Sequence, residues 1–332
     1  MTASPRFFVL GSNSFSGATF ADHLAALGHD VLAASRSPEP HPAFLPYKWQ
    51  ARPGRVRFSV LDINRDLDAL DALLRREKPT HVVNFAAQSM VAESWANPEQ
   101  WMTTNVVSTV RLHERLRRMD WLERYVHVTT PEVYGHTAGW VGEDAPFAPS
   151  TPYAVSRAAA DMSLATYFAQ YGFPVLFTRA ANVYGPGQRL YRVIPRTILS
   201  ALTGRTLCLH GGGVSVRSFI HMRDVAAATL AIATGGKVGE TYHIATTATV
   251  TVRELVAMIV ERLGKDFDAL VELAPERPGK DNAYRLDSSK LRTTLGWADR
   301  ITLDQGVDEI VGWAHDFVAD LPRLPWDYEH KP

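Results

Sequence analysis

The sequence predicts an α/β fold, a doubly wound parallel sheet followed by a smaller, mixed α/β lobe. Short apolar segments alternate with longer stretches of helical spacing as far as Thr178, the pattern of strands joined by helical crossovers. A glycine-containing turn separates the first strand from the first helix, as in nucleotide-binding folds. After Asn182 the alternation stops. We therefore expect a cofactor domain over residues 1–181 and a mainly substrate-binding lobe over residues 182–332, from which the chain can cross back to the first domain.

The predicted strands and helices of the first domain follow one another in turn. Strands are expected at residues 7–10, 30–34, 56–60, 81–85, 125–129 and 174–178, and helices at residues 12–27, 66–78, 98–119 and 150–171. Residues 38–54 are rich in proline and aromatic side chains and predict a long irregular loop over the adenosine end of a nucleotide. In the second lobe we expect helices near residues 194–203, 225 and 252, and strands near residues 207 and 219.

Composition places the chain among ordinary globular proteins. It has 332 residues, 46% of them hydrophobic, which is enough to bury a sizeable core. Because 35 basic residues balance 35 acidic ones, no net charge recruits nucleic acid or a membrane surface, and no apolar run is long enough to span a membrane. The single Cys208 excludes an internal disulfide, and no export signal precedes the first strand. We expect a cytoplasmic protein, and the scattered histidines predict no metal site.

The turn after the first strand reads G-S-N-S-F-S-G, from Gly11 to Gly17. Gly11 permits a sharp backbone turn, Gly17 permits close packing of the helix, and the helix N-terminus offers amides to a pyrophosphate. Ser14 replaces the middle glycine of such turns, so the motif alone is weak. Gly11, Ser14, Phe15 and Gly17 are the cofactor-binding candidates in this turn.

The end of the second strand bears on the choice between NAD and NADP. An acid commonly receives the adenosine ribose hydroxyls there, but this chain has Ser35, Arg36 and Ser37. A guanidinium flanked by hydroxyls suits a 2′-phosphate, so we expect NADP or NAD as cofactor, with NADP favoured. The alternative is that Arg36 points into water. After the third strand, Asp62 and Ile63 are placed to contact the adenine.

Small residues follow the fourth strand, where they let the backbone approach a cofactor. Ala86, Ala87 and Gln88 are the expected cofactor contacts. Ser89 is either a substrate contact or a simple turn residue. On the next helix, Asn105 is expected to face the sheet and to belong to the cofactor site.

The motif STPYAVSR, at residues 150–157, predicts a base for alcohol oxidation. Tyr153 and Arg157 are four residues apart, so a helix places both on one face, with the cation beneath the phenol. A nearby cation favours the ionised phenol, and a phenolate can accept the proton of an alcohol during hydride transfer. Tyr153 and Arg157 are therefore candidates for both catalysis and cofactor binding. The alternative is a surface pair.

A second motif, VTTPEVYG, follows the fifth strand at residues 128–135. Thr130 offers a hydroxyl and Glu132 a carboxylate, and Thr129 precedes them as a cofactor contact. These residues emerge at the carboxyl end of a parallel strand, which is the edge where ligands bind in open parallel sheets.

The second lobe carries basic residues that are separated from one another, Arg189, Arg192, Arg217, Arg223 and Arg277. Spaced cations suit a diphosphate group better than a continuous basic surface would. Arg189, Arg217 and Arg277 are therefore candidate substrate contacts. The alternative for each is an ordinary surface position.

Taken in order, the glycine turn, NFAAQS, TTPEVYG, YAVSR, NVYGPG, VRSFIHMRDVA and RPGKDNAYRLDSSKLRTTLGW resemble the extended short-chain dehydrogenase/reductase family, and within it the nucleotide-sugar 4,6-dehydratases. The resemblance runs from Phe7 to about Phe317. The motifs GETYHI and RPGKD are similar to motifs of the dTDP-glucose 4,6-dehydratases. The motif AAQSMVAES, and the absence of an acid at the end of the second strand, are more similar to the GDP-mannose 4,6-dehydratases. The family implies a Rossmann-type domain, a nucleoside-diphosphate sugar substrate, and a homodimer paired through the helices at residues 98–119 and 150–171.

The resemblance also implies a reaction cycle. Tyr153 takes the proton of the sugar 4-hydroxyl while hydride passes to NAD(P)+, and Glu132 then removes the acidified C5 proton. Hydroxide leaves from C6, and the hydride returns there. Thr130 would hydrogen-bond the 4-oxygen and Asn182 would help to hold the substrate. Epimerases of the family usually have a small residue in place of Glu132, whereas decarboxylases that act on nucleotide-linked uronic acids keep a Glu.

Two positions depart from the family pattern. Pro131 stands where the dTDP-glucose enzymes have an Asp that protonates the leaving hydroxyl, so elimination would need protonated Glu132 or a water. Arg157 replaces the usual Lys, keeping its charge and its reach to the nicotinamide ribose while closing a proton relay. The alternative to a 4,6-dehydratase is therefore an enzyme that oxidises C4 only transiently. Its overall reaction would be 5,6-dehydration, 5-epimerisation or decarboxylation. A non-catalytic NAD(P)-binding protein is the second alternative.

Overall fold

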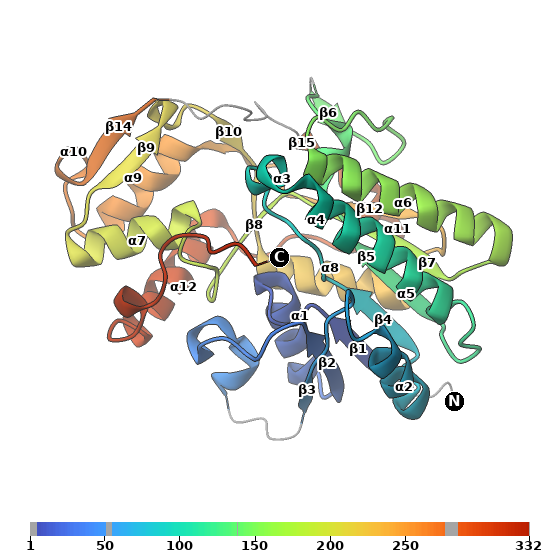
Figure 1. Ribbon diagram of the computed structural model, residues 1–332. Coiled ribbons are helices and arrows are strands. Elements are labelled where there is room, and N and C mark those ends of the chain that lie inside the picture. The colour runs from blue at the N-terminus through green and yellow to red at the C-terminus, as the bar shows by residue number, and fades with distance from the viewer. Residues whose placement is uncertain (1–4, 51–54, 138, 276–284, 332) are drawn as a thin grey trace.

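The structure, a computed structural model, describes residues 5–50, 55–137, 139–275 and 285–331. Its centre is a seven-stranded parallel sheet in the order β12-β7-β5-β4-β1-β2-β3 (Figure 1). The strands are β1 (Phe7–Leu10), β2 (Val31–Ser35), β3 (Val56–Val60), β4 (His81–Asn84), β5 (Arg124–Val128), β7 (Val175–Ala180) and β12 (Thr241–Ile244). Every residue of β1 and β2 is buried, as expected for parallel strands covered on both faces. The predicted doubly wound sheet is confirmed.

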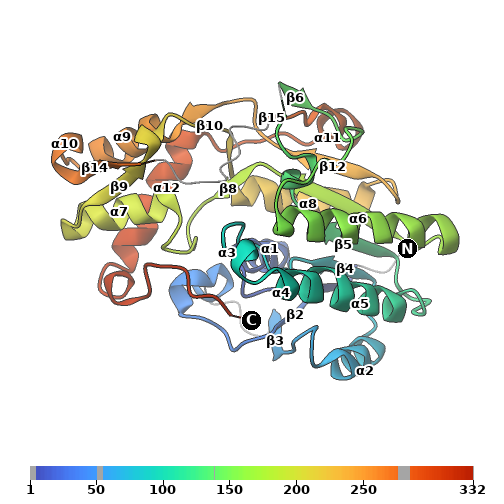
Figure 2. The ribbon, with the colours of Figure 1, turned by 45° about the horizontal axis from the view of Figure 1, so that its top comes forward.

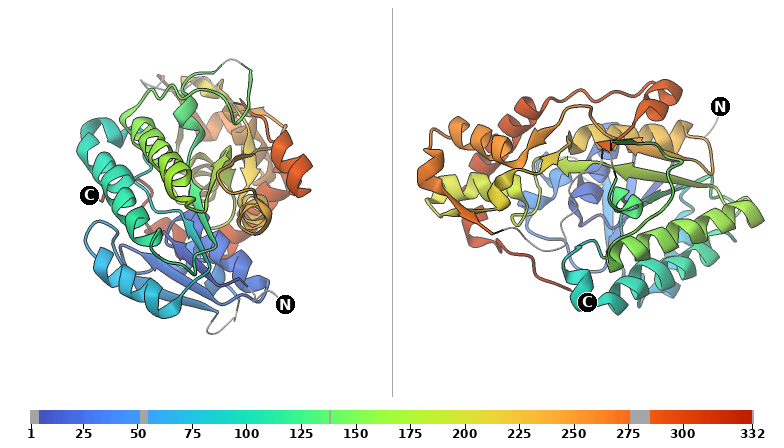
Figure 3. Two further views of the ribbon diagram at one scale, coloured as in Figure 1. Left: turned by 90° about the vertical axis from the view of Figure 1, so that its right-hand side faces the viewer. Right: turned by 90° about the horizontal axis from the view of Figure 1, so that it is seen from above.

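Helices cover both faces of this sheet. One face carries α1 (Phe15–Ala26), α8 (Met222–Gly235) and α11 (Ser289–Leu295), whose apolar side chains share a core with one side of the strands. The other carries α2 (Leu67–Glu77), α5 (Thr109–Leu116) and α6 (Pro152–Tyr171). Figure 3 shows α5 and α6 lying side by side on this second face.

The predicted single helix over residues 98–119 is interrupted. The chain forms α3 (Glu93–Ala96), α4 (Pro98–Met102), a π-helical segment (Thr103–Ser108) and then α5. The Thr109 hydroxyl donates to the Thr104 carbonyl at 3.0 Å, five residues back, which fits the wider π turn. The wider turn accommodates the buried Asn105, whose amide is engaged outside the helix.

The smaller lobe lies beside the carboxyl edge of the sheet (Figures 1 and 2). It contains α7 (Val193–Thr203), α9 (Val252–Arg262), α10 (Phe267–Leu270) and α12 (Leu303–Asp316), with the strand pairs β8 (Asn182–Tyr184) with β11 (Phe219–His221), β9 (Leu207–His210) with β14 (Val271–Ala274), and β10 (Val216–Arg217) with β13 (Val250–Thr251). A further pair, β6 (Trp140–Val141) with β15 (Arg285–Leu286), joins two distant segments near α6.

The chain crosses between the two parts more than once. After β11 it returns through α8 to the central sheet, where β12 pairs in parallel with β7, with Thr241 opposite Phe177. The sequence motif GETYHI includes this edge strand, which the pattern of alternating elements did not predict. The lobe is therefore built from pieces that are separated in the sequence.

Two irregular segments lie near the carboxyl ends of β1 and β2. The loop after β2 contains two short 3₁₀ helices, η1 (Pro42–Phe44) and η2 (Pro46–Lys48), where only irregular structure was expected. The last described residues follow the 3₁₀ helix η6 (Leu321–Arg323) and run back across the molecule between the lobe and the sheet (Figure 1).

Candidate functional site

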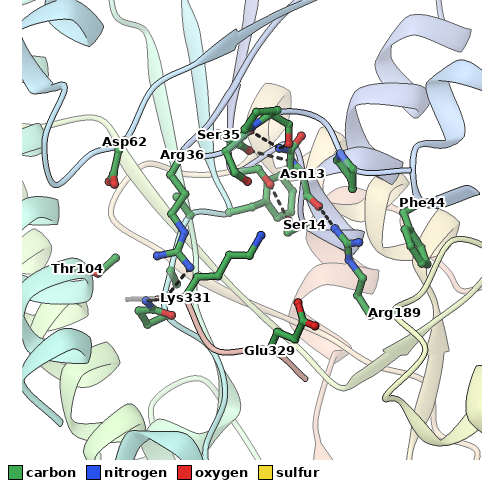
Figure 4. Close-up of a pocket in the computed structure, with 18 of the residues that line it drawn as sticks. Asn13, Ser14, Ser35, Arg36, Phe44, Asp62, Thr104, Arg189, Glu329 and Lys331 are labelled. Atoms are coloured by element: carbon green, nitrogen blue, oxygen red, sulfur yellow. Dashed lines mark hydrogen bonds between the residues drawn. The ribbon is translucent and has the colours of Figure 1, made fainter. Parts of the chain in front are cut away.

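A pocket of about 540 Å³ opens at the carboxyl ends of β1, β2 and β4 (Figure 4). Among the residues named from the sequence, it is lined by Gly11, Ser14, Ser35, Arg36, Asp62, Ile63, Ala86, Ala87, Gln88 and Arg189. All but Arg189 were expected to bind the cofactor. Crossover connections bring these residues together from separate parts of the first domain, which is how open parallel sheets form their ligand sites.

The glycine turn fits tightly at the base of this pocket. Gly11 has φ +83°, and a β-carbon there would lie 2.6 Å from the Ala86 nitrogen, so a side chain would be excluded. Gly17 does not line the pocket. A β-carbon on it would lie 2.3 Å from the Gly11 carbonyl oxygen, so Gly17 lets α1 pack against the turn. Ser14 caps α1, because its Oγ accepts from the Gly17 N–H at 3.0 Å.

The end of β2 is tied to its surroundings. The Asn13 N–H donates to Ser35 Oγ at 2.9 Å, so this hydroxyl helps to hold the glycine turn. Arg36 lines the pocket and donates to the Lys331 carbonyl at 2.9 Å. The alternative that Arg36 points only into water is therefore wrong. After β3, Asp62 also lines the pocket, and its Oδ1 accepts from the Asn64 N–H at 2.8 Å.

Asn105 positions Gln88 instead of lining either pocket described here. Its amide accepts from the Gln88 N–H at 2.8 Å and donates to the Gln88 carbonyl at 2.9 Å. It also donates to Ser156 Oγ on α6 at 2.9 Å. The Gln88 side chain in turn donates to the Lys331 carbonyl at 2.8 Å. Asn105, predicted as a cofactor contact, thus reaches the cofactor pocket only through Gln88.

A second pocket of about 860 Å³ adjoins the first and extends between the sheet and the lobe. Of the residues named from the sequence, it is lined by Ser14, Phe15, Ser89, Thr129, Thr130, Glu132, Tyr153, Asn182, Arg189 and Arg217. Arg277 lies outside the described residues. The two pockets share Asn13, Ser14, Arg189 and Tyr191. A molecule in one can therefore meet a molecule in the other.

Local structure brings the motifs VTTPEVYG and STPYAVSR together. Thr130 caps a short 3₁₀ helix, η4 (Pro131–Tyr134), directly after β5, with its Oγ1 3.4 Å from the Glu132 nitrogen. Pro131 is its first residue, a position that needs no N–H. Thr151 caps α6, and Tyr153 therefore lies in the first turn of that helix. Tyr153 and Thr130 are both buried, and they share a hydrogen bond.

The prediction that Tyr153 and Arg157 alone make a phenolate is wrong for the unliganded chain. Burial, and next the negative charge of Glu132, raises the pKa of Tyr153 to about 12. The charge of Arg157 and the hydrogen bond with Thr130 lower that pKa, but they do not offset the loss of solvation. The phenol is therefore protonated at neutral pH.

Arg157 lies beneath Tyr153 and lines neither pocket. It is 2% exposed, donates to the Val128 carbonyl, and has its Nη2 3.4 Å from His127 Nε2. Its guanidinium is thus directed under the end of β5. The contact of Arg157 with the nicotinamide ribose stays a prediction. The alternative of a surface pair is also wrong, because both side chains are buried.

A buried carboxylate balances part of this charge. Asp161, one turn beyond Arg157 on α6, accepts from Arg179 Nη2 at 2.8 Å and from Thr129 Oγ1 at 3.1 Å. Burial raises the pKa of Asp161 above its ordinary value, although the charges of Arg179 and Arg157 offset part of that rise. His127 is 3.6 Å from Asp161, yet burial and then Arg157 lower the pKa of this imidazole, so we treat it as neutral and not as an ion-pair partner. Of these groups, Arg157 is the one whose positive charge lowers the pKa of Tyr153.

Arg189, predicted as a substrate contact, lies at the boundary of the two pockets. Its guanidinium donates to the Asn13 carbonyl at 2.9 Å and stacks over the Phe44 ring, 4.5 Å from the ring centroid. Figure 4 shows it on the far side of the glycine turn from Arg36. The Arg189 guanidinium can therefore bind an anion in either pocket. Asn182 donates to the Ser218 carbonyl at 3.2 Å and so helps to hold β8 to β11.

Three contributors to the site were missed by sequence reasoning. Asn13 fixes the loop after β2 through bonds to the Ser37 and Pro38 carbonyls, and its place in the glycine turn was a usable signal. Asp161 could have been found from its spacing, four residues after Arg157 on the same helix face. Residues 325, 327–329 and 331, which line the first pocket, carried no signal because they lie beyond the family resemblance.

Two negative findings concern the described residues only. They include no group of three or more histidine, cysteine or acidic side chains able to hold a metal ion. Within the same residues, no helix combines the length and the apolar character needed to cross a membrane.

Comparison with known proteins identifies relatives over most of the chain. Residues 8–310 match the family model described as GDP-mannose 4,6 dehydratase. A dTDP-glucose 4,6-dehydratase of Xanthomonas campestris pv. campestris is 36% identical over 261 residues, which are 73% of this chain and 74% of that protein. A trifunctional UDP-glucose 4,6-dehydratase/epimerase/reductase of Arabidopsis thaliana is 35% identical over 261 residues, which are 77% of this chain but only 39% of that longer protein.

Solved structures show the same arrangement of elements. DesIV, a dTDP-glucose 4,6-dehydratase from Streptomyces venezuelae that was solved with NAD bound, superimposes with a TM-score of 0.87 at 32% identity. The match covers 96% of this chain and 99% of DesIV. Both the cofactor domain and the smaller lobe therefore have counterparts in that structure.

Proposed function

The chain belongs to the NAD-dependent nucleotide-sugar 4,6-dehydratases of the extended short-chain dehydrogenase/reductase family, and from this membership we propose that it converts a nucleoside-diphosphate hexose into the 4-keto-6-deoxy sugar. The observation that carries the proposal is the convergence of Thr130, Glu132 and Tyr153 in one pocket that adjoins the pocket at the glycine turn. Bound NAD(P)+ supplies the hydride acceptor for C4 and, after elimination, the donor for C6.

The first proton transfer falls to Tyr153. Its phenol oxygen takes the proton of the sugar 4-hydroxyl, and Thr130 holds the 4-oxygen by a hydrogen bond. The positive charge of Arg157 favours this transfer, because it stabilises the ionised phenol relative to the neutral one. Arg157 thus acts through Tyr153.

The second proton transfer falls to Glu132. Among the described residues that line the second pocket, it is the only carboxylate. Pro131 can donate no proton, so Glu132 serves twice, taking the C5 proton and then giving it to the hydroxide that leaves C6. One carboxylate can perform both steps when C5 and C6 present the proton and the leaving group on the same side.

The nucleoside diphosphate is held by the basic residues of the lobe. Arg217 and Arg192 line the second pocket together with Asn182, and Arg189 lies at its boundary with the first. Spaced guanidiniums bind diphosphate oxygens by paired, charge-assisted hydrogen bonds. Ser89 contributes a hydroxyl on the sheet side.

The direct test is the mass of the product after incubation with GDP-, dTDP- and UDP-hexoses. We expect the loss of one water from at least one of them. If a nucleotide-linked uronic acid loses carbon dioxide and no hexose is dehydrated, the protein is a decarboxylase and the proposal is wrong. The replacement of the acid by Pro131 is compatible with that alternative. If the mass of no nucleotide sugar changes, the non-catalytic NAD(P)-binding protein is the alternative that remains.

For the cofactor we propose NADP over NAD, because Arg36 lines the adenosine end of the first pocket where many NAD enzymes have an acid. Arg36→Ala should reduce the ratio of NADP to NAD affinity by about tenfold, the order expected for one charge-assisted phosphate contact. Equilibrium binding of both cofactors measures the ratio. Arg65→Ala, an exposed cation that does not line the pocket, should leave it unchanged. Equal affinities in the parent would contradict the preference.

We also propose a homodimer built on α6 and the π-helical segment before α5. Val107, Val155 and Met162 are 44%, 42% and 61% exposed there, an apolar surface that a second copy would cover. Met162→Glu should give a monomer in light scattering at micromolar concentration. Leu273→Glu places the same charge on an equally exposed leucine of β14 and should leave the dimer intact. A monomeric parent would count against this proposal.

A further inference from the structure

The residues after η6 form a strap, residues 324–331, that crosses the mouth of the first pocket. Five of its eight positions, residues 325, 327, 328, 329 and 331, line that pocket. Figure 4 shows the Lys331 side chain extending into the pocket from the side opposite Arg189. The family model ends at residue 310, so the family match does not extend to the strap.

The strap is attached at both ends of its path. At one end, the Trp326 carbonyl and Asp327 both accept from Arg196 of α7, Asp327 at 2.6 Å. Arg205 stacks over the Trp326 ring, with its guanidinium carbon 4.6 Å from the ring centroid. This end therefore belongs to the substrate lobe.

The other end is attached to the cofactor domain. His330 stacks on the buried Trp101 of α4, with ring centroids 5.1 Å apart and ring planes at 10°, and it hydrogen-bonds Gln100 at 2.5 Å. The Lys331 carbonyl accepts from Arg36 at 2.9 Å and from Gln88 at 2.8 Å. These two donors come from the ends of β2 and β4, so the strap joins both sides of the pocket.

The strap also changes the charge of the pocket. Lys331 adds a third cation to Arg36 and Arg189, and all three line a space shaped for a polyanionic dinucleotide. The strap brings acids too, but Asp327 is paired with Arg196. Glu329 also lines the pocket and brings one negative charge to it.

We propose that the strap is part of the cofactor site, with Lys331 as a ligand of the cofactor phosphates and the backbone attachments as a closure that slows release of the dinucleotide. Resting on the proposed function, closure has a clear use. The hydride taken from C4 returns to C6, so the cofactor ends each cycle in its starting state and does not have to leave. Slow opening of the pocket therefore does not lower the turnover rate.

The test is the rate at which preloaded NADH or NADPH leaves the full-length chain when excess oxidised cofactor is added, followed by the loss of bound-cofactor fluorescence. The double variant Asp327→Ala with His330→Ala loosens both ends, and we expect release to be at least about tenfold faster, the effect of losing about 1.4 kcal/mol of closure. Removal of residues 324–332 should do the same. Arg323→Ala, an exposed residue just before the strap, is the matched control and should release at the parental rate.

Lys331→Gln tests the charge separately. Release from the parent should accelerate with ionic strength, because salt screens an ammonium–phosphate contact, and the variant should show a flatter dependence. An unchanged dependence would remove Lys331 from the site. If the double variant or the shortened chain binds the cofactor more tightly or faster than the parent, the strap blocks the pocket, and the proposal is overturned. Release at the parental rate from both of these chains would also overturn it. A parent that binds no NAD(P)H would instead contradict the proposed function.

Discussion

Glu132→Gln is expected to abolish dehydration while leaving oxidation at C4 intact. The C5 hydrogen is acidic only while the neighbouring carbon is a ketone, so the base must already be positioned beside it. Gln keeps the shape of Glu132 and loses its basicity. Exchange of the C5 hydrogen with solvent deuterium should therefore fall by at least about a hundredfold, the usual contribution of a general base. Mass spectrometry of the recovered sugar measures the exchange.

The same variant should reduce the bound cofactor at least as fast as the parent. The charge of Glu132 is one of the causes that raise the pKa of Tyr153, so its removal lowers that pKa and increases the phenolate fraction at a given pH. Absorbance of the reduced cofactor in a single turnover measures this step. Glu99→Gln, an exposed position on α4, is the control and should behave as the parent in both assays. Exchange at the parental rate in Glu132→Gln would show that another group is the base.

Tyr153→Phe is expected to stop cofactor reduction, with a loss of about 10²- to 10⁴-fold in the single-turnover rate. Cofactor affinity should change little, because the substitution removes one hydroxyl and leaves every residue that lines the first pocket in place. Tyr171→Phe removes a hydroxyl from an exposed tyrosine of the same helix and should have no effect. Substantial reduction by Tyr153→Phe would remove the phenol from the mechanism.

The pH dependence follows from the raised pKa of Tyr153, about 12 in the unliganded chain. The active form is the deprotonated one, so the rate of cofactor reduction should rise with pH throughout the range below that value. Glu132→Gln should shift the rising limb to lower pH. A rate that does not vary between pH 7 and 10 would contradict this assignment of the base.

Much of the cofactor domain follows from local sequence alone. Strands such as β1 are short and uniformly apolar, and each is bounded by a turn or by a helix with a clear hydrophobic period. The hydrophobic pattern therefore predicts the order of the elements. The places of Thr130, Glu132 and Tyr153 follow from the same information. The first two come directly after a parallel strand, and the third comes directly after a helix cap, so both motifs emerge at the carboxyl edge of the sheet.

Sequence spacing could not decide where a side chain finds its partners. Arg157 and Tyr153 do share a helix face, but the Val128 carbonyl at the end of β5 draws the guanidinium inward, and burial outweighs its charge in setting the pKa of Tyr153. Asn105 was expected at the cofactor and instead holds Gln88, because a π-helical segment turns it inward.

Long-range pairing was likewise decided only by the tertiary structure. β12 completes the central sheet although it lies some 60 residues after its neighbour β7, because the edge of β7 offers unpaired backbone groups that a returning strand can satisfy. The strap reaches Arg36 and Gln88 from the far end of the chain, and no local pattern encodes such a contact. The sequence by itself determined the order of elements and the residue types of the candidate site, whereas contacts between distant segments determined the charge and the burial of that site.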